Sequence, residues 1–481
     1  MNRAPGYLAF AGLLTALGGC TVGPDYQGPP GVTPRAETAT TFVRGEHLDG
    51  DDPAVLSARW WETFRDPMLD NITLQALAYN PTIGAAVARL RQARSEVRLQ
   101  FANLLPTGSG DVLYARTHLP PLGGLFETPG SSGGTNFNLY ADSFDASWEI
   151  DVFGGQRRAL EAAHDTREGT EASLEDAQVS LSAEVSNAYI NLRDRQQRIA
   201  LGNREVDLLE KTLALAKQRY DGGTATKLDI SRIENQLEST RATLAPLKAE
   251  RDVYLDELAT LTGQEPGALD ATLRVPRRIP LPPARVKVGD PASLLRRRPD
   301  IRAAERTLAA DTAKIGQAEA KRFPEVRLLG IIGLGGTRAS DLTNLDDYTA
   351  LLAPQISWSF LDFGRNEARV HEAESVRDEA EAQYHDKVLA ALRDAEDSLS
   401  RFKYGRERVA TLARARKSAD EAASLASERY EAGAATLTDL LDTQRQKIDA
   451  EQDLSQAVGQ LSSYYVGINK ALGLGWEAPK S

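Results

Sequence analysis

The chain has 481 residues, 41% hydrophobic and 26% charged, which is enough apolar material for a core and enough length for about three domains. Lys+Arg 57 against Asp+Glu 68 gives a net charge of −11. This balance argues against nucleic acid as a partner, because nucleic-acid binding needs concentrated basic surface. After the first twenty residues no run of about 18 apolar residues occurs, so no membrane-spanning helix is predicted. A membrane-spanning β-structure remains possible, because its strands need apolar residues only at every second position.

The single cysteine, Cys20, follows a stretch typical of a secretory signal peptide. Arg3 gives a short basic start, residues 7–17 are mostly apolar, and Leu-Gly-Gly precedes the cysteine. This ending resembles the lipobox of bacterial lipoproteins, which implies that residues 1–19 are cleaved and that Cys20 becomes the lipid attachment site. Several acyl chains on Cys20 would hold the protein to a membrane stably, whereas one chain is a marginal anchor. A lone cysteine also excludes intramolecular disulfides and Cys-based metal clusters.

The sequence contains an internal duplication. Residues 147–154 (SWEIDVFG) realign with 357–364 (SWSFLDFG), and residues 219–226 (RYDGGTAT) realign with 429–436 (RYEAGAAT), both at an offset of 210. Two segments this far apart do not share an offset by chance. A period above 200 residues indicates a duplicated domain, whereas solenoid repeats are much shorter.

Each copy contains a long helical segment with apolar residues every seven positions. The heptad positions are Val185, Leu192, Ile199, Val206, Leu213 and Tyr220 in the first copy, and Val388, Ala395, Phe402, Val409, Arg416, Ala423 and Tyr430 in the second. No proline occurs from Gln156 to Tyr220, and such a helix would run roughly 100 Å. It must therefore pack against other helices along its length. Glycine-containing turns at Gly222-Gly223 and at Gly433 predict a return helix after each one.

Each copy also predicts one long β-hairpin. From Ser143 to Val152 apolar residues alternate with polar ones, so that one face of the strand is oily and the other is charged. Residues 326–334 and 348–360 repeat the pattern in the second copy, and residues 120–134 form the tip of the first hairpin. An ordinary hairpin on a globular body is the alternative interpretation.

Strand number favours a cyclic oligomer. One chain offers about four long strands, whereas bacterial membrane barrels have eight or more. Three chains would supply twelve strands. The long helices have the same requirement, because their apolar seams are buried only against equivalent neighbours.

Three segments carry a family resemblance. Residues 59–67 (RWWETFRDP), 77–81 (LAYNP) and 294–305 (LLRRRPDIRAAE) resemble, in the family's order, the signature segments of TolC-like outer-membrane channels (outer membrane factors) of tripartite efflux pumps, lipoprotein branch. The resemblance implies a mixed α and β fold, mainly α: a homotrimer whose long α-helical barrel continues into a transmembrane β-barrel, with about four strands per chain. It also implies a location in the bacterial outer membrane, where the protein is lipid-anchored and contacts outer-membrane lipid, and from which it extends into the periplasm. The implied partners are a periplasmic adaptor protein and an inner-membrane efflux transporter.

These elements predict how the chain is divided. The divisions are a signal peptide at 1–19, a lipidated N-terminal extension at 20–58, helices of the first repeat at 59–106, an outer-membrane β-hairpin at 107–153, a long helical hairpin at 154–263, an inter-repeat connector at 264–290, helices of the second repeat at 291–324, a second outer-membrane β-hairpin at 325–363, a second long helical hairpin at 364–473, and a C-terminal tail at 474–481.

The sequence predicts no catalytic, cofactor-binding or metal site, and hence no enzyme. The five histidines include no pair spaced i, i+4. Residues 330–336 are glycine-rich but lack the last glycine of a dinucleotide motif, and the basic stretch 274–302 is interpreted as a solvated linker. Two other functions remain open: a lipid-anchored coiled-coil envelope scaffold without a pore, which leaves the alternating hairpins unexplained, and an export channel for proteins or peptides.

The candidate aperture lies at the turns of the long helical hairpins. Asp439 and Asp442, just past the second turn, resemble the acidic periplasmic aperture positions of TolC-like channels. The resemblance further implies a contact between Tyr430 and Asp229 on neighbouring helices. Ala435 stands where the family often has an arginine. The alternative is that these polar groups are simply solvated at a loop.

We expect that Cys20→Ser abolishes incorporation of a radioactive fatty acid, because the thiol is the acceptor of the lipid. Metabolic labelling followed by immunoprecipitation measures this directly. Label that persists in the mutant would contradict acylation at Cys20.

Overall fold

The computed structural model describes residues 21–45, 58–119, 135–286 and 288–476. Cys20, the signal peptide and the hairpin tip at 120–134 lie outside the described residues. The chain divides into two compact units, of which one contains a β-sheet and the other a helical bundle. The sheet unit comprises Met1–Pro30, Arg91–Gly169 and Glu305–Gln383, and the bundle unit comprises Gly31–Leu90, Thr170–Ala304 and Tyr384–Ser481.

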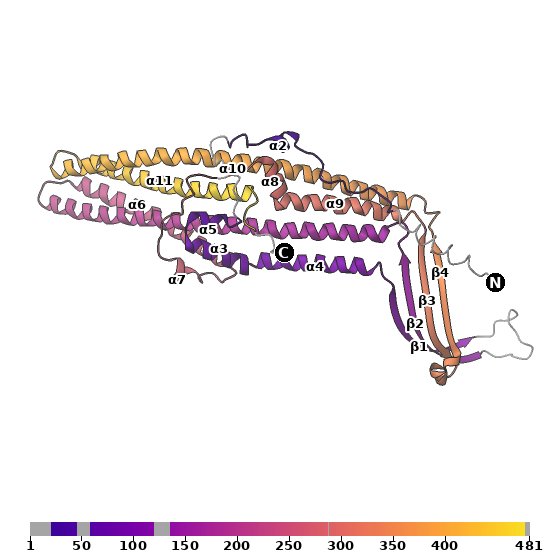
Figure 1. The fold of residues 1–481 in the computed structure, drawn as a ribbon. Helices are drawn as coiled ribbons and strands as arrows, with labels where there is room; N and C mark the ends of the chain where they lie inside the picture. Colours follow the sequence, from indigo (N-terminus) through magenta and orange to yellow (C-terminus); the bar gives the residue numbers. More distant parts are fainter. Residues whose placement is uncertain (1–20, 46–57, 120–134, 287, 477–481) are drawn as a thin grey trace, which may run out of the picture. The chain divides into compact units, whose positions relative to one another are not determined.

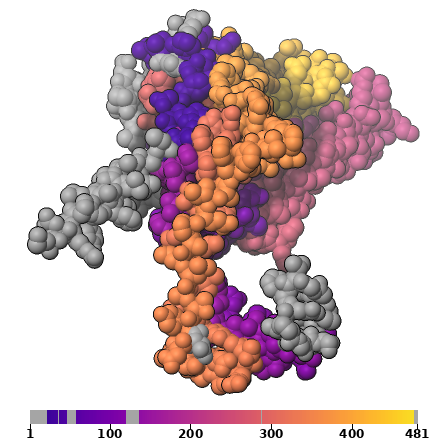
Figure 2. Space-filling model, turned by 90° about the vertical axis from the view of Figure 1, so that its right-hand side faces the viewer, coloured from indigo at the N-terminus to yellow at the C-terminus, as the bar shows by residue number. Residues whose placement is uncertain are grey.

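The sheet joins the hairpins of the two repeats (Figure 1). Its strands are β1 (Thr107–Leu119), β2 (Thr135–Ile150), β3 (Glu325–Gly336) and β4 (Tyr348–Ser357), antiparallel in the order β1-β2-β3-β4. Figure 2 shows the strand segments of the first repeat in purple beside those of the second in orange. The four predicted strands are therefore confirmed.

The strand register separates an oily face from a polar one. Phe144 pairs with Ile332, which pairs with Ala350, so apolar residues of successive strands share one face. On the other face Glu149 pairs with Arg327, whose guanidinium lies 3.6 Å from the Glu149 carboxylate. The Phe144 side chain is 73% exposed, so the described residues leave this part of the apolar face largely uncovered.

The helical bundle repeats one hairpin twice. Helices α5 (Gly155–Asp221) and α10 (Arg365–Glu431) each have 67 residues, and the return helices α6 (Lys227–Leu261) and α11 (Leu437–Ala471) each have 35. The equal lengths agree with the duplication, and the long helices predicted from the heptads are confirmed. Among the described helices, none combines the length and apolar character that crossing a bilayer requires.

Shorter helices precede the strands and connect the repeats. They are α2 (Pro34–Thr38), η1 (Trp60–Phe64), α3 (Pro67–Tyr79), α4 (Pro81–Ala102), α7 (Asp270–Leu273), α8 (Pro291–Arg297), α9 (Pro299–Ala320), η2 (Ala339–Thr343) and η3 (Leu345–Asp347). Helix α3 begins with an N-cap, because the Asp66 carboxylate accepts the Met68 N–H at 3.0 Å.

An aromatic cluster around Trp60 forms the centre of the bundle core. Trp60 and Trp61 are almost fully buried, and Trp60 meets Phe64 and Tyr465 edge to face, with ring centroids 6.3 Å apart in both cases. The tryptophan pair of the RWWETFRDP segment is therefore structural: it fixes the short helices of the first repeat against α11.

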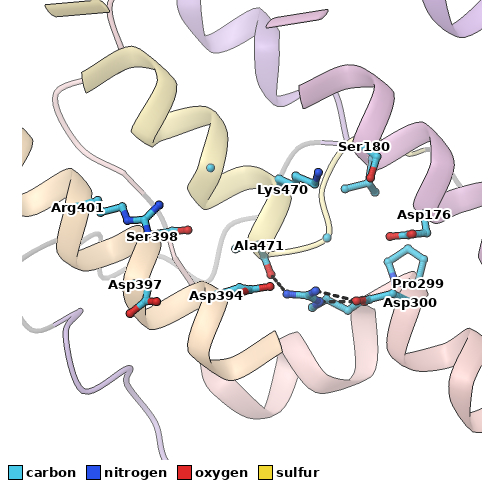
Figure 3. A pocket seen from close by; sticks show the side chains of 14 residues that line it. Asp176, Ser180, Pro299, Asp300, Asp394, Asp397, Ser398, Arg401, Lys470 and Ala471 are labelled. Carbon is cyan, nitrogen blue, oxygen red and sulfur yellow. Dashed lines mark hydrogen bonds and ion pairs between the residues drawn. The ribbon is translucent and has the colours of Figure 1, made fainter. Parts of the chain in front are cut away.

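The third signature segment, which contains Arg298, holds neighbouring helices together. Arg298 donates two hydrogen bonds to the Asp300 carboxylate, at 2.9 and 2.7 Å, and one to the carbonyl of Ala471 at 3.0 Å. Figure 3 shows these bonds at the edge of a cavity of about 350 Å³ between α5, α9, α10 and α11. Burial alone would raise the pKa of Asp300, but the bonds from Arg298 outweigh it and hold that pKa below its usual value. Arg298 also places positive charge at the C-terminal end of α11, where the helix dipole favours it.

Candidate functional site

Both long hairpins turn through the same backbone motif. In the first turn the Gly223 N–H donates to the Tyr220 carbonyl at 2.9 Å and the Thr224 N–H donates to the Arg219 carbonyl at 2.8 Å. Gly433 and Ala434 make the corresponding bonds in the second turn, at 3.1 and 2.7 Å. The two glycines have φ of +77° and +73°, the left-handed conformation that ends helices and favours glycine.

The first carboxylate past each turn caps the helix that follows it. The Asp229 carboxylate accepts from the N–H and the hydroxyl of Thr226 at 2.9 and 2.7 Å, and the Thr226 hydroxyl oxygen accepts the Asp229 N–H at 3.2 Å. Asp439 and Thr436 make the same reciprocal set, at 3.1, 2.7 and 3.2 Å. These are capping boxes, and they fix where α6 and α11 begin.

Hydrogen bonding controls the ionisation of both capping carboxylates. The backbone and side-chain hydrogen bonds from Thr226 hold the pKa of Asp229 below its ordinary value. The side-chain and backbone hydrogen bonds from Thr436 do the same to the pKa of Asp439. Both groups are therefore anionic at neutral pH, and each of the two turns is followed by a negative charge at the start of its return helix.

Asp442 lies one turn further along α11 and is not part of a cap. Its carboxylate is 3.8 Å from the Arg445 guanidinium, and both side chains are 56% exposed. An exposed pair at this distance contributes little binding energy. In the first repeat the position equivalent to Asp442 is Arg232, so the duplicated hairpins present opposite charges here.

Two polar contacts and an apolar cluster join the hairpins near the turns. Arg219 of α5 lies over the Tyr430 ring of α10, with its guanidinium carbon 4.8 Å from the ring centre. Arg232 of α6 donates to the Thr438 hydroxyl of α11 at 2.9 Å. The buried members of the cluster are Leu209, Ala216, Ile233, Leu237, Leu437 and Leu440.

The expected contact of Tyr430 with Asp229 is not among the hydrogen bonds and ring contacts of the described chain. Within the chain the Tyr430 ring faces Arg219 and the Asp229 carboxylate bonds Thr226. Contact between Tyr430 and Asp229 remains a prediction. The sequence patterns predict no role for Arg219 or Arg232, although Arg219 lies three residues before Gly222 and Arg232 lies nine residues after Gly223.

The residues that the structure describes contain no group of three or more His, Cys, Asp or Glu side chains placed to hold a metal ion.

Comparison with known proteins identifies the family. The family model described as "Outer membrane efflux protein" matches residues 73–264 and 291–474, one segment for each repeat. The chain belongs to the outer membrane efflux protein family. It is therefore an outer-membrane channel component of an efflux system, as the signature segments predicted.

Relatives and a solved structure of similar length support the same family assignment. Nodulation protein T of Rhizobium leguminosarum bv. trifolii is 30% identical, over 96% of this chain and 95% of that protein. The pyoverdine export outer membrane protein OpmQ of Pseudomonas aeruginosa is 31% identical, over 88% of each chain. A solved structure of the outer-membrane channel OprN is 34% identical and superposes with a TM-score of 0.87, over 95% of this chain and all of that one.

We expect that Asp229→Ala and Asp439→Ala each loosen the first turn of α6 and α11, because the mutation frees the N–H of Thr226 or Thr436. Hydrogen–deuterium exchange of the purified protein should show faster exchange at these amides. Asp442→Ala is the matched control, since Asp442 caps nothing and should leave them unchanged.

The pH dependence follows from the lowered pKa values of the two caps. A carboxylate with a lowered folded-state pKa stabilises the fold above its unfolded-state pKa, about 3.9 for Asp, and this stabilisation is lost as the pH falls through the lowered value. Protection of the two turns should therefore be constant from pH 7 to pH 5. A loss within that range would contradict the capping role.

Proposed function

We propose that three copies of this chain form a channel that passes substrates from a periplasmic adaptor and an inner-membrane efflux transporter to the cell exterior. The chain supplies a conduit and no catalysis of its own, and Cys20 carries a lipid that assists its hold on the outer membrane. The observation that carries this proposal is the sheet, which has an oily face and two edges without a strand partner within the described chain.

The two edge strands of the sheet, β1 and β4, support closure of the sheet between copies of the chain. In the described chain β1 pairs only with β2, and β4 pairs only with β3. Backbone N–H and C=O groups left unpaired in lipid each cost several kcal/mol. Pairing β1 of one copy with β4 of the next would satisfy both edges, and three copies would form a closed sheet of twelve strands. A scaffold without a pore gives no reason for such a sheet.

The turns of the long hairpins are the proposed periplasmic aperture, formed by Asp229, Tyr430, Asp439 and Asp442. Around a threefold axis the copies of Asp439 and Asp442 would face one another, attract cations and repel anions. The Arg219–Tyr430 and Arg232–Thr438 contacts hold the two hairpins of one chain together at the same level. Opening that separates the hairpins would have to break both contacts.

We expect that replacing Asp439 and Asp442 together by Asn weakens cation selectivity, because it removes two negative charges from each copy while keeping side-chain size. The reversal potential of single channels in a planar bilayer under a salt gradient measures the selectivity. Asp252→Asn, an acidic-to-amide change on α6 far along the chain from the turns, is the matched control and should leave selectivity unchanged.

The same single-channel recordings test the proposed contact between Tyr430 and Asp229. Tyr430→Phe combined with Asp229→Ala should raise single-channel conductance, because a lost hydrogen bond of about 0.5 to 1.5 kcal/mol per copy no longer opposes opening. Tyr220→Phe, the equivalent change in the first repeat, is the control. If selectivity and conductance stay unchanged in both combined variants while the channels still insert, the aperture lies elsewhere.

A further inference from the structure

The first described residues of the chain are docked on the sheet unit. The Val22 N–H donates to the carbonyl of Phe153 at 3.1 Å, just past the end of β2. Gly154 follows with a φ of +80°, and a Cβ placed on it would lie 2.6 Å from Cγ2 of Thr21. Thr21 therefore occupies the space that a side chain at position 154 would need.

Arg158, in the first turn of α5, holds the same segment. Its side chain is only 3% exposed, and its guanidinium donates to the carbonyls of Val22 and Gly23, both at 3.2 Å, and to the Asp25 carboxylate at 2.6 Å. A further bond, at 2.8 Å, goes to Glu161. A buried guanidinium needs these acceptors, because an unpaired buried charge is strongly unfavourable. Arg158 thus depends on the N-terminal segment for most of its partners.

Two glycines allow the segment to lie directly on α9. Gly23 has a φ of +87°, and a Cβ on it would lie 2.3 Å from Cα of Gly316. A Cβ on Gly316 would in turn lie 2.7 Å from the carbonyl oxygen of Val22. Neither position has room for a side chain, so backbone meets backbone at this contact.

The second repeat provides an internal comparison. At the offset of 210, Arg158 corresponds to Ala368 and Gly154 corresponds to Gly364. Gly364 has nearly the same φ, +83°, but no atom of the described chain lies within 4 Å of a Cβ built on it. The turn itself therefore requires neither an arginine nor a filled space. Arg158 and the close contact at Gly154 serve the N-terminal segment.

Two tryptophans lie near the strand ends of the same unit. The indole N–H of Trp148 donates to the carbonyl of Leu104 at 2.9 Å, and that of Trp358 donates to the carbonyl of Arg322 at 3.0 Å. Both rings are partly exposed at the ends of the strands. Tryptophan at the ends of membrane strands marks the level of the lipid headgroups.

We propose that Arg158, Gly154 and Gly316 form a latch that positions the lipid anchor. The latch fixes residues 21–25 beside the junction of β2 and α5. This segment begins at Thr21, the residue directly after Cys20. Because consecutive Cα atoms lie about 3.8 Å apart, acyl chains on Cys20 would start close to Thr21 and would enter the membrane beside the ends of the strands. The inference rests on the proposed acylation of Cys20 and adds the residues that determine where the anchor is held.

Hydrogen–deuterium exchange on the full-length processed protein in lipid nanodiscs tests the docking. Arg158→Gln and Asp25→Ala should each speed exchange at the Val22 amide by about tenfold or more, the loss expected when hydrogen bonds to a charged group are removed. Asp25→Ala changes only the segment and leaves the turn intact. Gly154→Ala should have the same effect, whereas Gly364→Ala, with the same backbone strain, should not.

A photoactivatable diazirine fatty acid, incorporated during growth, tests the position of the anchor. Irradiation should cross-link the lipid to peptides near Trp148 and Phe153, and Arg158→Gln should spread the cross-links over other segments. Incorporation with unchanged exchange, or with the same cross-links in Arg158→Gln, would overturn the latch alone. Absence of incorporation would overturn acylation, and the positioning role with it.

Discussion

Backbone hydrogen bonding at the edges of the four-stranded sheet is the constraint on which the rest of this structure depends. The described chain gives β1 and β4 one strand partner each, while the oily face that includes Phe144 stays exposed. Lipid accepts apolar side chains but tolerates no row of unpaired N–H and C=O groups. A sheet of this composition is therefore stable in a membrane only when other copies complete it, and this requirement is the reason for the proposed trimer.

The duplication supplies the matching parts, and a few substitutions make the copies different. Equal helix lengths, the same turn geometry and the paired capping boxes show what both repeats need in order to fold. The differences lie where one repeat has a task of its own. Arg232 against Asp442 changes the charge beside the turns, and Arg158 against Ala368 gives the N-terminal segment a binding place on one repeat only.

Local periodicity explains why so much of the fold could be predicted. The two-residue alternation of residues 143–152 and the heptads of the long helices are visible without tertiary knowledge. The Thr-x-x-Asp pattern of Thr226 and Asp229 is an equally local signal, because it is typical of a helix cap. Contacts such as Arg219 with Tyr430, or Arg298 with the end of α11, join residues far apart in sequence, so no local sequence pattern predicts them. The docking of residues 21–25 also has no periodic sequence pattern, so no sequence signal predicts it.

The number of chains in the assembled protein tests this account most directly. Native mass spectrometry of the detergent-solubilised, full-length processed protein counts the chains in the intact particle. The account predicts a single dominant species of three chains, since twelve strands are the proposed closure. A monodisperse, folded single chain with exposed sheet edges would contradict it.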